Sequence, residues 1–195
     1  KRQGIELILD ESYRLQVTDL NHNGEGVGKV DGFTLFIPGA LPGESVSVKV
    51  KKLHRNYGDA TLTAIEERSD DRIAPLCPYF PVCGGCQLQH LNYSGQLAWK
   101  KNMVEETLRR LAGINVQIEP VIGMSNPWHF RNKARIHFNL DRGKLDIGFY
   151  TSGSRRVIDI KKCPVQHPAN EILINAVRKA LNIFIKKYNI SSLND

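Results

Sequence analysis

The sequence has few cysteines and no segment that would direct the chain out of the cell or anchor it in a membrane. Only 4 of its 195 residues are cysteine, no uncharged apolar run is long enough to span a bilayer, and no signal peptide opens the chain. These absences argue against a secreted disulfide scaffold and against a membrane protein. We therefore expect a cytoplasmic protein whose cysteines are reduced.

Acidic residues are also in the minority, with 20 Asp and Glu against 27 Lys and Arg and a formal net charge of +7. Residues 1–70 carry 9 basic and 11 acidic side chains, whereas residues 71–195 carry 18 and 9. A basic excess indicates a polyanionic partner such as nucleic acid. The surface that faces this partner is predicted mainly in the second part of the chain.

Residues 11–69 are expected to form a small five-stranded barrel. Runs rich in Val, Leu, Ile and Thr alternate with turn signals, including Asp31-Gly32 for a two-residue hairpin and 41–44 (LPGE) for a type II turn. Five strands in about 55 residues fit an oligonucleotide-binding-type barrel. The glycines of NGEGVGKV are interpreted as hairpin glycines, because no Ser or Thr and no helix follow as a phosphate-binding loop requires.

The remainder of the chain mixes helices and strands. Helical spacing of apolar residues predicts helices over 94–112, ended by Gly113, and over 168–188. Strands are predicted over 116–123, 130–140, 144–150 and 155–160. The predicted fold class is therefore mainly β with α: an OB-like barrel followed by an α+β domain.

The cysteines form the most specific pattern in the sequence. Cys77, Cys83 and Cys86 lie within CPYFPVCGGCQLQH, and Cys163 follows in KKCP. This three-plus-one spacing favours a 4Fe–4S cluster, since thiolates bind such centres and the glycines let backbone N–H groups approach the sulfurs. Structural zinc, which usually takes two paired CxxC arms, and inert cysteines stay as alternatives. His90 is expected to brace the loop rather than to bind metal.

The composite motif C-x5-C-G-G-C-x2-Q-H with a distant C-P resembles the iron–sulfur, S-adenosylmethionine-dependent RNA uridine-5-methyltransferases, which make 5-methyluridine in 23S ribosomal RNA. GEGVGKV and ALPGESV resemble the TRAM domain of this family. The resemblance implies a TRAM RNA-binding barrel at 11–69, a central iron–sulfur domain at 70–93 and 113–195, and a methyltransferase domain that has no counterpart here. The chain begins with Lys1 rather than Met, so we expect a truncated form of a longer parent.

Candidate RNA contacts come mainly from the basic, aromatic-rich region 128–162. PWHFRNKARI resembles an aromatic-Arg-Asn-Lys segment of the family, which implies Arg131, Asn132 and Lys133 as the first candidates. Cationic groups neutralise phosphates and aromatic faces stack on unpaired bases. The remaining candidates share these properties: Trp128, Phe130, Arg135, Arg155, Arg156 and, on the barrel, Arg55 and Tyr57. Ordinary solvated strand faces and a solvated hairpin tip remain the alternative.

The sequence offers no catalytic machinery. No glycine-rich turn opens a helix after a strand, and no cysteine is spare for attack on uridine C6. We therefore expect no catalytic and no S-adenosylmethionine-binding residue in this chain, which should be inactive alone. We interpret the chain as the RNA-binding and substrate-positioning portion of a 23S rRNA uridine C5 methyltransferase. A stand-alone RNA-binding module with a structural metal site is the alternative, and a ferredoxin-like electron carrier fits less well because of the basic charge.

The helix predicted over 94–112 has an apolar stripe of Leu97, Val104, Leu108 and Leu111. The family resemblance implies that this helix packs on the methyltransferase domain. An isolated amphipathic helix of this length is marginal in water. We therefore expect it to be mobile or to be covered by a second copy of the chain in a homodimer.

Overall fold

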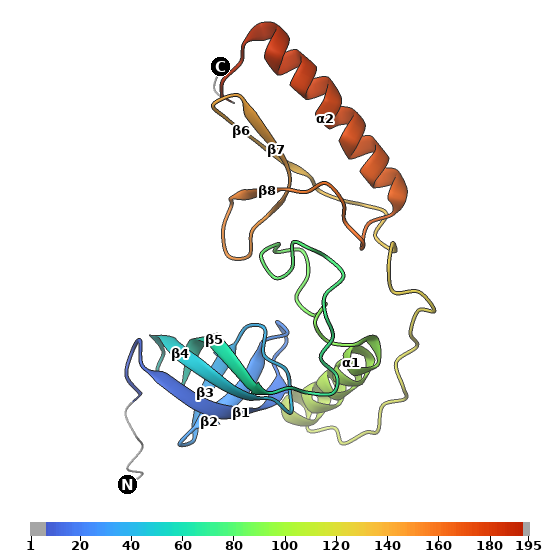
Figure 1. Ribbon diagram of the computed structural model, residues 1–195. Helices are drawn as coiled ribbons and strands as arrows, with labels where there is room; N and C mark the ends of the chain where they lie inside the picture. Colours follow the sequence, from blue (N-terminus) through green and yellow to red (C-terminus); the bar gives the residue numbers. More distant parts are fainter. Residues whose placement is uncertain (1–6, 193–195) are drawn as a thin grey trace. The chain divides into compact units, whose positions relative to one another are not determined.

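The computed structural model describes residues 7–192 and divides them into two compact units. The barrel unit comprises residues 7–74 and 87–122, and the cysteine unit comprises residues 75–86 and 123–192 (Figure 1). The loop that carries three of the cysteines thus belongs to a different unit from the chain on either side of it. Each unit is described below by itself.

Five strands close the barrel predicted from the sequence. They are β1 (Ser12–Leu20), β2 (Gly26–Val30), β3 (Phe33–Ile37), β4 (Ser45–Leu53) and β5 (Tyr57–Glu67), in the order β1-β2-β3-β5-β4. All neighbours are antiparallel except β3 and β5, which run parallel. Closure pairs the strands on both sides, so the barrel has no free edge that could pair with another chain.

The barrel core follows from strand alternation. On β4, Val46, Val48 and Val50 are fully buried, and Leu35 and Ile37 of β3 face them in the same apolar cluster. Each such side chain stabilises the fold by about 1.5–3 kcal/mol through burial. The barrel unit therefore has a complete hydrophobic core of its own.

The two predicted turns have the expected backbone. Asp31 and Gly32 have φ values of 50° and 86°, as a two-residue hairpin with both central residues left-handed requires. Gly43 has a φ of 84°, and the Glu44 amide donates to the Leu41 carbonyl at 3.2 Å, which makes 41–44 a type II turn.

Gly28 of β2 has a packing role. A Cβ added there would lie 2.3 Å from Leu15 Cδ1 and 2.7 Å from the Gln16 carbonyl oxygen. The barrel therefore needs glycine at this position, in agreement with a structural role for the glycine-rich stretch.

The first predicted helix forms within the barrel unit. It comprises α1 (Tyr93–Thr107) and a π-helical turn (Leu108–Ala112), and Gly113 ends it with a left-handed φ of 67°. The Asn92 side chain caps its start by accepting from the Gly95 amide at 2.7 Å.

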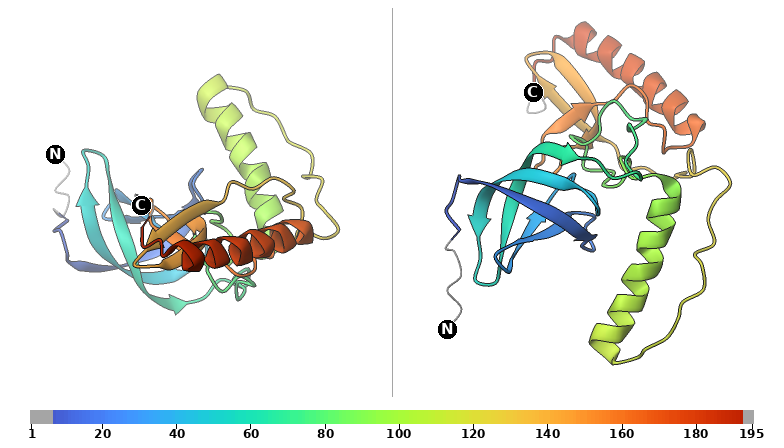
Figure 2. Two further views of the ribbon diagram at one scale, coloured as in Figure 1. Left: turned by 90° about the horizontal axis from the view of Figure 1, so that it is seen from above. Right: turned by 60° about the horizontal axis from the view of Figure 1, so that its bottom comes forward.

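One side chain anchors this helix to its own chain. Trp99 packs against Leu20, Leu41 and Leu91, and its indole N–H points at the Leu20 carbonyl at 3.4 Å. No described residue of α1 is buried, however, and Figure 2 shows α1 projecting beside the barrel. The helix predicted over 94–112 is confirmed, and it groups with the barrel.

The cysteine unit contains a three-stranded antiparallel sheet and one long helix. The sheet runs β6 (His137–Asp141), β7 (Lys144–Tyr150), β8 (Val157–Asp159), and α2 (Pro168–Tyr188) lies along it (Figure 1). Ile185 of α2 closes a small core, whose other buried members are Leu140, Leu145 and Ile147. The predicted second helix and the β6–β7 hairpin are therefore confirmed.

Part of the strand prediction was wrong. Residues 116–123 and 130–136 are not in strands, and the predicted first central strand is reduced to β6. A strand requires a hydrogen-bonded neighbour, and within residues 7–192 no strand runs alongside these segments. Only an isolated bridge joins Arg131 to Gln166. Residues 113–136 are mostly exposed as a result.

Candidate functional site

All four cysteines belong to the cysteine unit, and none is joined to another in a disulfide within the described residues. Cys77 and Cys83 are buried, and Cys86 and Cys163 are half-buried. The Phe80 amide donates to the Cys77 carbonyl at 3.2 Å and the Cys83 amide donates to the Tyr79 carbonyl at 2.8 Å. The loop is thus folded on itself, so that its sulfurs are held by backbone turns.

The C-terminal end of β7 and the turn after it hydrogen-bond to the same loop. The Gly84 amide donates to the Tyr150 carbonyl at 3.0 Å, and the Ser152 amide donates to the Val82 carbonyl at 2.9 Å. The Tyr79 hydroxyl accepts a hydrogen bond from the amide of Lys161. Lys161 lies two residues before Cys163. These contacts bring the CGGC loop and the KKCP segment into one region of the unit.

The thiols act on one another electrostatically. Burial raises the pKa of the Cys83 thiol, the Gly85 N–H partly opposes this, and the negative charges of Cys86, Cys77 and Cys163 raise it further. The raised pKa of Cys83 means that its thiolate is disfavoured in the absence of a cation. Four cysteines are the donor set of Fe–S clusters and of structural zinc.

The residue types of the four cysteines suit a metal, but their side chains are not arranged around a common metal position. Among residues 7–192 there is no group of three or more His, Cys, Asp or Glu side chains placed to hold a metal ion. The predicted ligand set Cys77, Cys83, Cys86 and Cys163 therefore stays a prediction.

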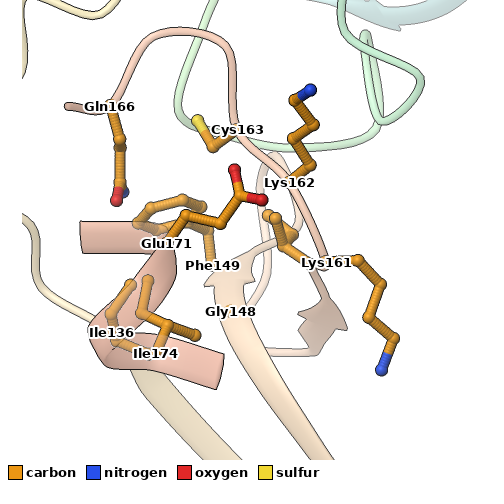
Figure 3. Close-up of a pocket in the computed structure, with 10 residues that line it drawn as sticks. Ile136, Gly148, Phe149, Lys161, Lys162, Cys163, Gln166, Glu171 and Ile174 are labelled. Atoms are coloured by element: carbon orange, nitrogen blue, oxygen red, sulfur yellow. The ribbon is translucent and has the colours of Figure 1, made fainter. Parts of the chain in front are cut away.

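A small hollow lies beside Cys163 (Figure 3). Its volume is about 20 Å³, the size of one water molecule, and Phe149, Gln166 and Glu171 are among its lining residues. Figure 3 shows Glu171 pointing its carboxylate toward the Cys163 side of the hollow. Gln166 is 3% exposed and its amide nitrogen and oxygen have no hydrogen-bond partner. A single water would satisfy that amide.

The first RNA candidates lie on a segment fixed to the Cys163 region. The Arg131 amide donates to the Val165 carbonyl at 3.0 Å, and the Arg131 carbonyl accepts from the His167 amide at 2.9 Å. His129 contributes its amide to the Pro164 carbonyl and a ring nitrogen to the Gln166 carbonyl, both at 3.0 Å. The structure therefore connects the predicted RNA segment with the fourth cysteine.

Around this anchor the candidate side chains face solvent. Asn132 is exposed, Phe130 is 51% exposed, and Trp128 is half-buried. Five cations are exposed and form no salt bridge within the described part of the chain: Arg131, Lys133, Arg135, Arg155 and Arg156. Exposed cations without an acidic partner are suited to contact phosphates.

The two barrel candidates lie at the β4–β5 hairpin. Tyr57 is 38% exposed, stacks on His54 with ring centroids 4.3 Å apart, and lies 5.2 Å from the Phe36 ring. Arg55 is exposed beside them. The hairpin thus presents an aromatic surface beside the exposed side chain of Arg55.

His90 belongs to the barrel unit, where it is 2% exposed. Its pKa is lowered to about 4, first by burial and then by the positive charge of Arg72, with Glu44 opposing. Glu44 is fully buried, and its carboxylate accepts from Arg72 at 2.8 Å and from the Leu41 amide at 2.8 Å. His90 therefore lies near a buried ion pair, Arg72–Glu44, which holds the segment after β5 against the barrel.

Two features of the cysteine unit involve residues that are not among the candidate contacts chosen from the sequence, although His137 and Tyr150 belong to its basic, aromatic-rich region. His137 and Tyr150 stack with ring centroids 3.7 Å apart, and Gln166 is buried. His137 and Tyr150 could have been paired from the β-hairpin register, which sets His137 opposite Gly148 and so two residues from Tyr150. No sequence signal marks Gln166.

The comparisons with known proteins agree on an RNA-modifying relationship. Residues 11–63 match the TRAM domain family. An RNA methyltransferase of Listeria innocua is 44% identical over 172 residues, covering 88% of this chain and 38% of that protein. One of Clostridium tetani is 39% identical over 190 residues, covering 97% of this chain and 40% of that protein. The chain thus spans about two fifths of the length of these relatives.

A solved structure gives the same relationship. The tRNA (uracil-54, C5)-methyltransferase of Pyrococcus abyssi, in complex with S-adenosyl-L-homocysteine, matches with a TM-score of 0.58 and 25% identity. The match covers 92% of this chain and 38% of that one. Within residues 7–192, no helix has both the length and the apolar character needed to cross a membrane. The chain contains a TRAM barrel and is similar to RNA methyltransferases over nearly its whole length.

Proposed function

We propose that this chain is the RNA-binding and substrate-positioning portion of an S-adenosylmethionine-dependent RNA uridine C5 methyltransferase that acts on 23S ribosomal RNA in the cytoplasm. The observation that carries the proposal is the pairing of a TRAM barrel with the exposed, unpaired cations at 131–135 of the cysteine unit. The similarity to RNA methyltransferases over 88–97% of the chain supports it.

The two units would divide the binding. The barrel offers the Tyr57 aromatic surface and Arg55, whereas the cysteine unit supplies the larger number of phosphate-directed cations. Backbone hydrogen bonds join Arg131 to Val165 and His167, so the backbone that carries its guanidinium group is held in place. A backbone that is already ordered reduces the entropy lost when the side chain contacts a phosphate.

The cysteines would hold a 4Fe–4S cluster through Cys77, Cys83, Cys86 and Cys163. The four thiols lie in one unit, and their charges act together on Cys83. When bound, the cluster would join the CGGC loop to the KKCP segment and offset part of the thiolate charge. Arg131 would then be positioned through the hydrogen bonds that follow Cys163.

Methyl transfer would require parts of the parent protein beyond these 195 residues. The relatives are longer than this chain, which covers 38–40% of them. S-adenosylmethionine would be the methyl donor of the parent, in keeping with the S-adenosyl-L-homocysteine in the Pyrococcus abyssi structure. The chain alone would bind RNA without methylating it.

The homodimer predicted through residues 94–112 remains a proposal of its own. Val104 is 42% exposed and Leu111 is 84% exposed, so part of the helix surface is available to a second copy. Light scattering over a concentration series tests it. A monomer at every concentration would rule out the homodimer, and hydrogen exchange across residues 97–111 would then distinguish a mobile helix from one held by the Trp99 contact.

RNA binding in a salt series tests the proposed function. A 23S rRNA fragment should bind with an affinity that falls steeply with salt, and a tRNA of similar length should bind more weakly. Tighter binding of the tRNA would indicate that tRNA is the substrate, as the name of the Pyrococcus abyssi enzyme states for that protein. If neither RNA bound with a salt dependence, the RNA-binding role itself would be lost.

A further inference from the structure

A second hollow in the cysteine unit lies where the CGGC loop meets the end of β7. Its volume is about 290 Å³, and its lining includes Gly84, Gly85, His137, Tyr150 and Ser152. None of its lining residues is a cysteine, although Gly84 and Gly85 lie between Cys83 and Cys86 in the sequence. The volume is at the lower limit for small-ligand pockets, about 300–1,000 Å³, which suits one flat ring with its sugar.

One wall of this hollow is aromatic. The rings of His137 and Tyr150 are stacked 3.7 Å apart at an angle of 19°, and both side chains are half-buried. Phe149 also lines the hollow. A flat heterocycle could extend such a stack, because every nucleobase has a π face that aromatic side chains can cover.

Another part of the lining, which includes Thr151 and Ser152, is polar and belongs to a turn closed by hydrogen bonds. The turn after Tyr150 is closed by a hydrogen bond from the Thr151 amide to the Arg156 carbonyl at 2.9 Å, and the Arg156 amide donates to the Ser154 hydroxyl at 3.1 Å. The turn also carries Arg155 and Arg156, which are exposed and have no acidic partner within the described residues. Two cations therefore lie on the turn that forms one side of an aromatic hollow.

From this combination we infer that the hollow receives one unpaired nucleotide of the RNA, with its base against the His137–Tyr150 stack and a flanking phosphate at Arg155 or Arg156. The inference rests on the proposed RNA-binding function and adds that the RNA presents an unpaired nucleotide to this hollow. Bases of an A-form duplex have their faces covered by their neighbours, so only a single-stranded or looped nucleotide can enter.

The test compares two single-stranded RNAs of equal length and charge, an oligouridylate and the same strand with abasic sugars, by fluorescence anisotropy. The wild-type protein should bind the oligouridylate more tightly. Tyr150→Ala should weaken oligouridylate binding about 5- to 100-fold, the loss of one stacked base, and leave abasic binding within about twofold. Tyr150→Phe should keep the wild-type preference because it keeps the ring.

Tyr188→Ala is the matched control, since Tyr188 is an exposed tyrosine of α2 in the same unit and lines no part of the hollow. It should leave both affinities unchanged. Equal affinities of the wild type for the two strands, or an equal loss for both strands in Tyr150→Ala, would overturn the nucleotide site while leaving phosphate binding in place. No binding of either strand would overturn the proposed function as well.

Discussion

The barrel unit and the cysteine unit are stabilised in different ways. In the barrel, ten buried apolar side chains form one cluster inside a closed sheet. In the cysteine unit the main cluster has four buried members between one three-stranded sheet and α2, and long segments without regular structure surround the cysteines. A domain with so small a core usually needs a disulfide or a metal. We propose that a ligand bound by the cysteines would provide the missing stability.

The charges follow the same division. Residues 1–74 and 87–122 carry 14 basic and 15 acidic side chains, whereas residues 75–86 and 123–195 carry 13 and 5. The unit with the larger apolar core is therefore the less basic one. Stability and RNA affinity should respond separately to substitutions in the two units, and the following predictions test that separation.

The largest effect is expected from removing the cysteine ligand. Cys83→Ser should abolish the hydrogen-exchange protection of β7 and α2, because structural metals contribute on the order of 10 kcal/mol to small domains. Protection of β4 and β5 should not change. Ser152→Ala, in the turn that contacts the loop, serves as the control and should leave both units protected. If β7 stayed protected in Cys83→Ser, the cysteine unit would be stable without a metal.

The next effect should be confined to the barrel unit. Arg72→Met leaves the fully buried Glu44 carboxylate without its cation, which should lower the free energy of unfolding by about 3–5 kcal/mol. Arg14→Met is the control, since its salt bridge with Glu66 is exposed and screened by solvent and should contribute little to stability. Urea unfolding followed at Trp99 measures both. Similar midpoints for the two variants would contradict the importance of the buried pair.

Acid should weaken the barrel unit through His90. Its pKa in the folded protein is about 4, below the usual 6.5, so the unfolded chain takes up a proton first as the pH falls. Stability is therefore fully present above pH 6.5 and declines as the pH falls toward 4, by about 3 kcal/mol in total. Urea midpoints from pH 7 to 4 measure this. His90→Leu should flatten the profile above pH 4.5, and an unchanged slope would assign the decline to other groups.

The Glu44 carboxyl adds a second acid transition at lower pH. Burial raises its pKa, but the Arg72 hydrogen bond and the Leu41 amide outweigh burial and hold the pKa below the usual 4.5. Its contribution is present above pH 4.5 and is lost as the pH falls through the lowered value. His90→Leu should therefore still lose stability below pH 4.5.

The smallest effects concern RNA. Arg131→Ala and Lys133→Ala should each weaken binding to a 23S rRNA fragment and reduce the salt slope by about one phosphate contact. Arg14→Ala, a barrel cation already paired with Glu66, should change neither. Binding isotherms at several salt concentrations measure the slopes. A larger loss in Arg14→Ala than in Arg131→Ala would reverse the assignment of the RNA surface to the cysteine unit.

The sequence predicted the parts of the fold that are set by local chemistry. Asp31-Gly32 and Gly43 specify turns by their backbone preferences, and alternating valines on β4 identify the inward face of a strand. Residues 116–123 have strand-like composition but no neighbour to pair with, so the prediction failed where long-range pairing decides. Residue identity alone also could not show that His137 and Tyr150 stack, because that contact depends on the hairpin register.

The most direct test of the difference between the two units is the metal content of protein purified without oxygen, by absorption spectrum with iron and acid-labile sulfide analysis. The account predicts a brown protein with about four iron and four sulfide per chain, bound by Cys77, Cys83, Cys86 and Cys163. Cys163→Ser should reduce both. Stoichiometric zinc with no iron in the wild-type protein would contradict the cluster and leave a structural zinc in its place.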